Sequence, residues 1–164
     1  MSLYAAVLLA VFRMVVIPVQ FEDREFVYSE TQMKAMVQQA EDYFNGQPGV
    51  QPQYIFDLAP TVSLPKPAAY YGANYSDRKD VLLHQAVREA CARSDIDFSQ
   101  YDNNSDGSVD NVFIVTAGPS EADGAGEDWI WPQRGFLKDH GGTAEADGKT
   151  LNSFCVCPEL TGIG

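Results

Sequence analysis

The chain has 164 residues, of which 45% are hydrophobic and 12% aromatic, and this composition is typical of one globular domain with a real core. Eleven basic residues against twenty-three acidic ones give a formal net charge of −12. Such a charge repels nucleic acid and anionic membrane surfaces. We therefore expect no nucleic-acid partner and a secreted or extracellular protein, with the periplasm as a further compatible compartment.

The first apolar run, residues 3–10, lacks the basic leader of a secretory signal. Arg13 and Pro18 then interrupt the apolar stretch before it reaches the roughly 20 residues that a membrane-spanning helix needs. We therefore expect no membrane span. Residues 1–13 are interpreted as an N-terminal segment of uncertain or artificial origin, followed by one domain at residues 14–164, and any secretion signal is expected to have been removed.

The first predicted elements are a strand and a helix. Residues 14–21 are mostly apolar and predict a buried strand, in which Pro18 indicates an edge position or a local break in the ladder. Ser29 and Gln32 form a capping box, and apolar residues between 33 and 44 recur at helical spacing. They predict an amphipathic helix whose stripe of methionine and aromatic side chains packs in the core.

Further along the chain, strands and helices interleave. Residues 54–57 and 61–64 predict two short strands between proline-rich turns, and residues 77–93 predict a second amphipathic helix. Two more strands are predicted at residues 111–117 and 149–157. This alternation predicts an α/β or α+β layered fold, with a twisted mixed β-sheet and packing helices.

An acidic loop before the strand at 111–117 has the spacing of a calcium-binding loop. The candidate calcium ligands occupy alternating positions: Asp102, Asn104, Asp106, Ser108 through its carbonyl, and Asp110. Gly107 supplies the turn, but Phe113 replaces the Glu that closes an EF-hand, so we expect a weak affinity of roughly 10⁻⁴ to 10⁻³ M. The alternative interpretation is an Asx-rich turn that only launches the next strand.

Other active-site motifs are missing from the sequence. It contains no HExxH, no Gly-x-Ser-x-Gly and no glycine-rich phosphate loop. We expect His84 to border the apolar face of its helix and His140 to be solvated. Cys91, Cys155 and Cys157 are expected to be small buried hydrophobes and not zinc ligands, and a disulfide involving Cys91 remains open.

Five segments, and the order in which they follow one another, carry a family resemblance. They are VVIPVQFEDREF at 15–26, AEDYFN at 40–45, DFSQYDNNSDGSVDNVFIVTAG at 97–118, WIWPQR at 129–134 and LNSFCVCPEL at 151–160. Together they resemble the immune inhibitor A type of secreted bacterial zinc metallopeptidases, a family of the zincin class. The most specific part is the third segment followed by IWP. The resemblance spans residues 15–164.

The resemblance implies the N-terminal subdomain of a zincin catalytic domain, in which an edge strand receives the peptide substrate by β-augmentation. In that family a helix bearing HExxH follows a segment like Glu159-Leu160, and this helix supplies the zinc ligands and the water-activating Glu. These 164 residues contain no HExxH, so no family catalytic residue can be assigned. The acidic loop matches a family stretch that resembles a structural calcium site.

Two function hypotheses follow. The first is the N-terminal portion of a secreted zinc metalloendopeptidase, which ends before the zinc-binding helix, is inactive alone and self-associates through an uncovered sheet face. Peptides or proteins would be the substrates of the longer protein, which would hold the zinc. The alternative is a complete non-catalytic, calcium-stabilised extracellular binding module, in which Trp129, Trp131, Tyr70 and Tyr71 are recognition residues instead of buried aromatics.

Overall fold

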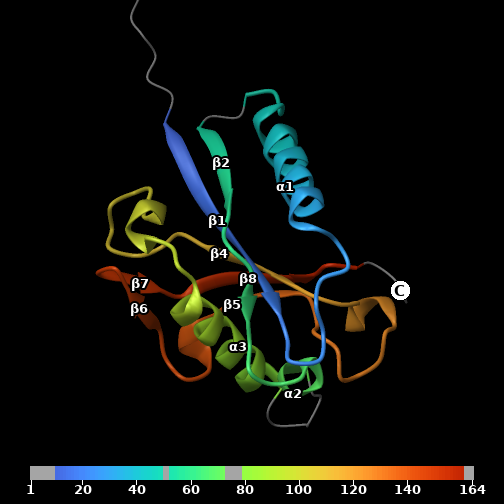
Figure 1. The fold of residues 1–164 in the computed structure, drawn as a ribbon. Helices are drawn as coiled ribbons and strands as arrows, with labels where there is room; N and C mark the ends of the chain where they lie inside the picture. Colours follow the sequence, from blue (N-terminus) through green and yellow to red (C-terminus); the bar gives the residue numbers. More distant parts are fainter. Residues whose placement is uncertain (1–9, 50–51, 73–78, 161–164) are drawn as a thin grey trace, which may run out of the picture.

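One β-sheet organises the chain, and its strands come from both halves of the sequence (Figure 1). The computed structural model describes residues 10–49, 52–72 and 79–160. The strands of the main sheet are β1 (Val11–Gln20), β2 (Gln53–Leu58), β3 (Val62–Ser63), β4 (Val112–Thr116), β5 (Gln133–Phe136) and β8 (Ser153–Pro158). The helices are α1 (Glu30–Asn45), α2 (Ala68–Gly72) and α3 (Lys79–Arg93), with short 3-10 helices η1 (Phe98–Tyr101), η2 (Glu121–Asp123) and η3 (Leu137–Asp139). A separate hairpin pairs β6 (Ala144–Ala146) with β7 (Lys149–Leu151).

The main sheet is mixed, with the order β2-β1-β4-β8-β5 and with β3 also paired to β1. All its pairs are parallel except that of β5 with β8, which is antiparallel. Parallel neighbours need crossover connections, and here α1 connects β1 to β2 while α2 and α3 lie between β3 and β4. The expected mixed sheet with packing helices is thus confirmed.

β1 is an interior strand of the sheet and begins three residues earlier than the sequence pattern predicts. Val11 to Arg13 pair with Gln53 to Ile55 of β2, so they belong to the sheet. Pro18 is not in an edge strand. Its position falls between the end of the β2 pairing at Val16 and the start of the β3 pairing at Val19, so the missing N–H lies at a break in the ladder.

The two faces of the sheet are covered differently. The closed face packs against α3 and carries alternate residues of the three central strands: Val15, Ile17, Val19, Val112, Ile114, Phe154 and Val156. Each of these side chains is at most 3% exposed. The other face, which we call the open face, lies beside α1 and carries Val16, Pro18, Phe56, Leu58, Phe113, Val115, Cys155 and Cys157. Several of these residues remain partly exposed.

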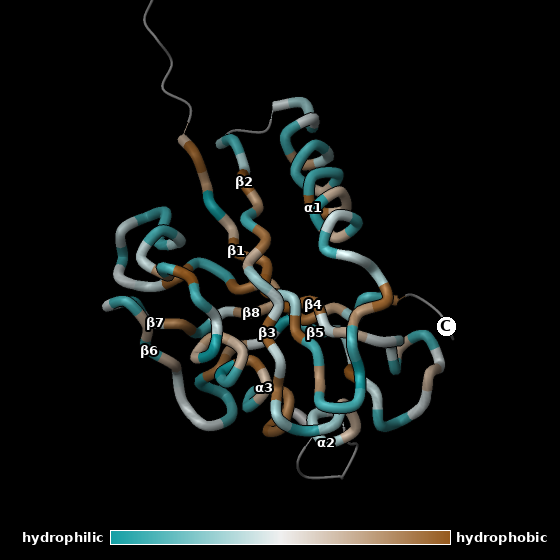
Figure 2. Tube along the Cα trace, viewed as in Figure 1, coloured by the Kyte–Doolittle hydropathy of each residue, from teal (hydrophilic) through white to brown (hydrophobic). Residues whose placement is uncertain are grey.

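α1 begins as predicted and packs less deeply than predicted. Ser29 and Gln32 form both bonds of the capping box. Met33 is buried, but Met36 and Phe44 are 42% and 45% exposed, so the expectation that the whole stripe packs in the core is wrong. Figure 2 colours most of α1 as hydrophilic, which fits a narrow apolar stripe touching the sheet along one line.

Several local features were not predicted from the sequence, among them the short strand β6. β5 follows the tryptophan segment in a stretch for which no strand was predicted, and α2 lies in a stretch for which no helix was predicted. The strand predicted at 149–157 is two strands, β7 and β8, separated by Asn152. No helix in the described ranges is long and apolar enough to cross a membrane.

Candidate functional site

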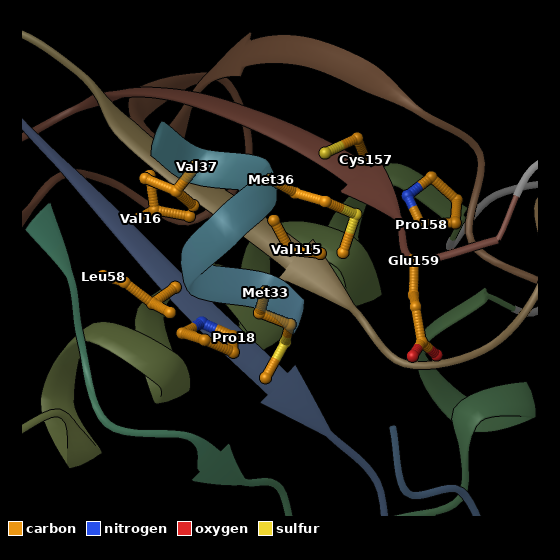
Figure 3. A pocket seen from close by; sticks show the side chains of 10 residues that line it. All are labelled: Val16, Pro18, Met33, Met36, Val37, Leu58, Val115, Cys157, Pro158 and Glu159. Atoms are coloured by element: carbon orange, nitrogen blue, oxygen red, sulfur yellow. The ribbon is translucent and has the colours of Figure 1, made fainter. Parts of the chain in front are cut away.

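A pocket of about 200 Å³ lies between α1 and the open face of the sheet (Figure 3). Its lining is almost entirely apolar: Val16, Pro18, Met33, Met36, Val37, Leu58, Val115, Cys157 and Pro158, with Glu159 at one end. In Figure 3 the two methionines project from α1 toward the strands. Exposed apolar surface of this kind marks a place where another chain segment, a partner or a ligand packs.

An aromatic row extends this apolar surface away from Glu159. Phe44 of α1 stacks on Phe56 of β2 with 5.7 Å between ring centroids, and Phe56 meets Phe113 of β4 edge-on at 6.0 Å. Tyr54 lies 6.0 Å from Phe44. The row joins the helix to two strands, so the open face is a continuous apolar surface and not a set of isolated hydrophobic residues.

Glu159 ties together the segments that border the pocket. Its carboxylate accepts a 2.6 Å hydrogen bond from the backbone N–H of Tyr28 and a 3.3 Å bond from that of Gly118. The Leu160 N–H in turn donates to the Gly118 carbonyl at 3.2 Å. The chain after β8 is thereby held beside both the start of α1 and the end of β4. This carboxylate therefore links the segments on both sides of the pocket.

β5 forms the far edge of the sheet, opposite β2. Arg134 pairs with Cys155 and Phe136 with Ser153, which places both side chains on the open face. The Leu137 N–H donates to the Asn152 carbonyl at 2.8 Å, so the Phe136–Ser153 pair is of the non-hydrogen-bonded type. The backbone groups of Arg134 and Phe136 therefore point away from β8, toward the outer edge.

The acidic loop folds around its first carboxylate. Asp102 accepts bonds from the N–H groups of Asp106 and Gly107, both at 3.0 Å, and from Lys149 Nζ at 2.7 Å. Its side chain is 1% exposed. The hydrogen bond from Lys149 is the largest cause of a lowered Asp102 pKa, and the two backbone donors also lower it.

The remaining predicted ligands point into the same loop but are already hydrogen-bonded there. Asn104 accepts from the Asp106 N–H at 2.9 Å, and Asp106 accepts from the Ser108 N–H at 2.9 Å. Asp110 accepts two bonds from Asn103, from its N–H at 2.9 Å and its side-chain amide at 2.8 Å. These Asx-type bonds belong to the turn interpretation, so the geometry is compatible with either prediction for the loop.

Asn103 was not singled out in the sequence, yet it attaches the loop to the sheet. Its side-chain oxygen accepts from the Arg13 N–H at 2.7 Å, and its amide donates to the Arg13 carbonyl at 3.0 Å. One side chain thus supplies both bonds that a neighbouring strand would give, at a point of β1 before β4 pairing begins at Val15. The only sequence signal is an extra amide within the Asx-rich loop.

The ligand types in the loop suit a hard cation, but the positive charge of Lys149 opposes its binding. Three carboxylates, an amide oxygen and a main-chain carbonyl are ligands that calcium accepts. The Lys149 ammonium, however, already neutralises Asp102, so a cation would have to displace it. Across the described ranges no three His, Cys, Asp or Glu side chains lie together in an arrangement that could hold a metal. Calcium binding at Asp102, Asn104, Asp106, Ser108 and Asp110 therefore remains a prediction.

The two histidines lie together, although the sequence placed them on unrelated segments. Their rings meet edge-on with 4.8 Å between centroids. His84 is buried against Phe154, and its Nε2 lies 3.1 Å from the Phe136 carbonyl, which can only accept, so Nε2 carries the proton. His140 is half-buried, whereas the sequence predicted a solvated side chain. This pair connects α3 to the end of β5.

The three cysteines are free and differ in environment. Cys91 is buried in α3, and burial raises the pKa of its thiol to about 12. Cys157 is exposed at the open face, and its pKa is raised by partial burial and by Cys155. The expectation of buried thiols is therefore correct for Cys91 alone.

The aromatic residues proposed for recognition are also divided. Tyr71 is fully buried, and Trp129 is half-buried with the Arg24 guanidinium 5.0 Å from its ring centroid. Trp131 and Tyr70 are 45% and 37% exposed. These four side chains therefore do not form one exposed recognition surface.

No protein-family model and no curated protein matches this chain.

Proposed function

We propose that this chain is the N-terminal portion of a secreted zinc-dependent metalloendopeptidase domain of the immune inhibitor A type. The observation that carries the proposal is the open face: a continuous apolar surface beside α1 that a further helix of the same protein would cover. The segment resemblance described above names the class of that helix. Its HExxH motif would supply zinc and the activated water.

The position of Glu159 supports this proposal. The carboxylate holds the chain after β8 against the start of α1, at the end of the apolar pocket. A helix that continued from this point would enter alongside α1 and pack on Met36 and Val115. Its burial there would remove from water the apolar surface that the open face exposes, at roughly 25 cal/mol per Å².

The edge position of β5 supports a peptide substrate. A sheet edge with outward-facing N–H and C=O groups can accept an extended peptide as an added strand. In this proposal β5 orients the peptide backbone and the open face positions the covering helix. The chain's own residues bind and orient the peptide, while the chemistry of hydrolysis belongs to residues beyond Leu160.

The test is to read the source gene past the codon for Gly164 and to express the longer product. We expect an HExxH motif shortly after that codon and hydrolysis of a fluorogenic peptide that 1,10-phenanthroline abolishes. Replacing the Glu of that motif by Gln should abolish hydrolysis while zinc stays bound. The 164-residue chain assayed alongside should be inactive with added zinc. A stop codon with no such motif would exclude the proposal.

A second candidate function is a calcium-stabilised binding module without catalysis, and the folded acidic loop favours it. Asp102, Asn104 and Asp106 would hold the ion together with the Ser108 carbonyl and Asp110. Millimolar calcium at constant ionic strength should then raise the Tm, and Lys149→Gln should increase that shift because it removes the competing ammonium. If the Tm is the same with calcium as with magnesium or extra sodium, the loop does not bind calcium specifically and is only a turn.

A further inference from the structure

The outer edge of β5 carries three backbone groups that no described residue binds. They are the N–H and C=O of Arg134 and the N–H of Phe136, since the Phe136 carbonyl already accepts from His84. A strand that paired with this edge would find donors and acceptors in the alternation that a β-ladder requires. The side chains beside these groups then decide which peptide fits best.

Those side chains are cationic. The Arg134 guanidinium lies 5.7 Å from the centroid of the Phe136 ring, and Lys138 Nζ lies 5.4 Å from the same centroid. Phe136 is 38% exposed, and both cations are exposed as well. Within the described part of the chain neither Arg134 nor Lys138 is paired with a carboxylate. Two unpaired cations around one aromatic ring are notable in a protein of net charge −12.

The backbone that carries both cations is held in place. Arg134 lies within the β5–β8 ladder, and its contact with the ring restrains the side chain. Lys138 donates its backbone N–H to Asn152 Oδ1 at 3.0 Å. The loop that carries Lys138 is further held by Arg88 of α3, which donates to the His140 carbonyl at 2.8 Å. The backbone beneath both cations is therefore ordered before a peptide binds.

We infer that the β5 edge binds an extended peptide with acidic side chains, whose carboxylates meet Arg134 and Lys138 while its backbone pairs with Arg134 and Phe136. Side chains of an added strand alternate between the two faces, so every second one lies on the open face, where both cations gather. This inference rests on the proposed peptide-binding role of β5 and adds the side-chain class that it prefers.

The test measures binding to the 164-residue chain by fluorescence anisotropy, without zinc or turnover. The probes are a short, end-blocked, fluorescein-labelled peptide in which Glu and Val alternate, the same peptide with Lys in place of Glu, and the acidic peptide N-methylated at alternate backbone nitrogens. Because the net charge of −12 favours the basic peptide, a preference for the acidic one has to come from local cations. Amide exchange at Arg134 and Phe136 is followed by NMR.

We expect the acidic peptide to bind more tightly than the basic one and to protect both amides. Arg134→Glu with Lys138→Glu should weaken its binding about tenfold or more, because two attractive contacts become repulsive. Arg134→Lys with Lys138→Arg should retain most of the affinity. Lys66→Glu makes a charge change of the same kind on the exposed loop after β3, at the other side of the sheet, and should leave the affinity within about twofold.

Three results would overturn the inference: tighter binding of the basic peptide, no binding of either peptide up to millimolar concentration, or unchanged binding of the N-methylated peptide. The last would mean adsorption by charge alone and no added strand. The peptidase proposal is tested separately, by zinc-dependent hydrolysis in the longer protein. Conversely, a missing HExxH motif would leave acidic-peptide binding at this edge intact.

Discussion

The closed and the open face of the sheet have the same strand periodicity and different cover. On the closed face, Val15, Ile17 and Phe154 are fully buried beneath α3. On the open face, the matching positions next along each strand meet α1 alone among the described elements and leave an apolar pocket. Alternation within a strand shows which residues share a face, whereas the cover over that face depends on which other segments pack there.

The difference has an energetic meaning. Full burial of a Val, Ile or Phe side chain contributes about 1.5–3 kcal/mol, and partial burial contributes correspondingly less. The closed face should therefore carry most of the stability of the described fold. The open face should contribute less as long as its surface stays in water, and it should gain in stability when another segment covers it.

The largest expected effect tests this comparison directly. Phe154→Ala should lower the free energy of unfolding by about 3–5 kcal/mol, because the ring is fully buried and stacks edge-on against His84. Phe113→Ala on the open face should cost markedly less, since that ring is only partly buried. Urea unfolding followed by circular dichroism measures both.

If Phe113→Ala were as costly as Phe154→Ala, the open face would already be covered in solution, for example by a second copy of the chain. Repeating the measurement over a range of protein concentrations distinguishes that case. A concentration-dependent cost at Phe113 alone indicates self-association, which the comparison of the two faces predicts for an uncovered apolar surface.

The second prediction concerns β1 before β4 pairing begins. Asn103→Ala should cost about 1–3 kcal/mol, because the backbone N–H and C=O of Arg13 lose their partners along with one bond to Asp110. Amide exchange at Arg13 should also accelerate. Asn104→Ala is the matched control: this side chain is exposed and, among the described residues, bonds only to Asp106, so the loss should be smaller.

Local patterns predicted α1, α3 and the central strands because their signals are local. The capping box of Ser29 and Gln32 specifies where α1 begins, and the prolyl ring of Pro18 specifies a break in the ladder. β5 was missed because Gln133, Arg134 and Gly135 have neither the apolar alternation nor the β-branched side chains of a strand. Pairing with β8 decides its structure, and pairing is not visible in the segment itself.

The site was less predictable than the fold for the same reason. The candidate ligands from Asp102 to Asp110 follow from their spacing, but the ion pair of Asp102 with Lys149 joins residues 47 positions apart. The meeting of His84 with His140 likewise depends on how η3 docks on α3. Contacts between distant segments are set by tertiary packing, which a reading of one sequence does not supply.

The third prediction uses pH to separate the loop from both faces. The folded-state pKa of Asp102 lies below its unfolded value of about 3.9, so its contribution to stability is complete above that pH and is lost as pH falls through the folded pKa. Asp102→Asn should therefore show a shallower loss of stability below about pH 4 than the parent chain. Lys149→Gln should flatten the profile too, because Lys149 is the main cause of the lowered pKa. Equal slopes in all three proteins would exclude this linkage.

The smallest expected effect on stability is at Cys157, so labelling this thiol reports on the open face while the fold is hardly perturbed. Methylthiolation of this exposed thiol should change the free energy of unfolding by no more than about 0.5 kcal/mol. The reaction should accelerate with pH, since partial burial and Cys155 raise the thiol pKa and the thiolate is the reactive form. Cys91, buried beneath the closed face with a pKa of about 12, should react only when the protein unfolds. Mass spectrometry after limited labelling reports both rates. Protection of Cys157 to the same degree as Cys91 would mean that both faces are covered in solution, which would contradict the distinction between them.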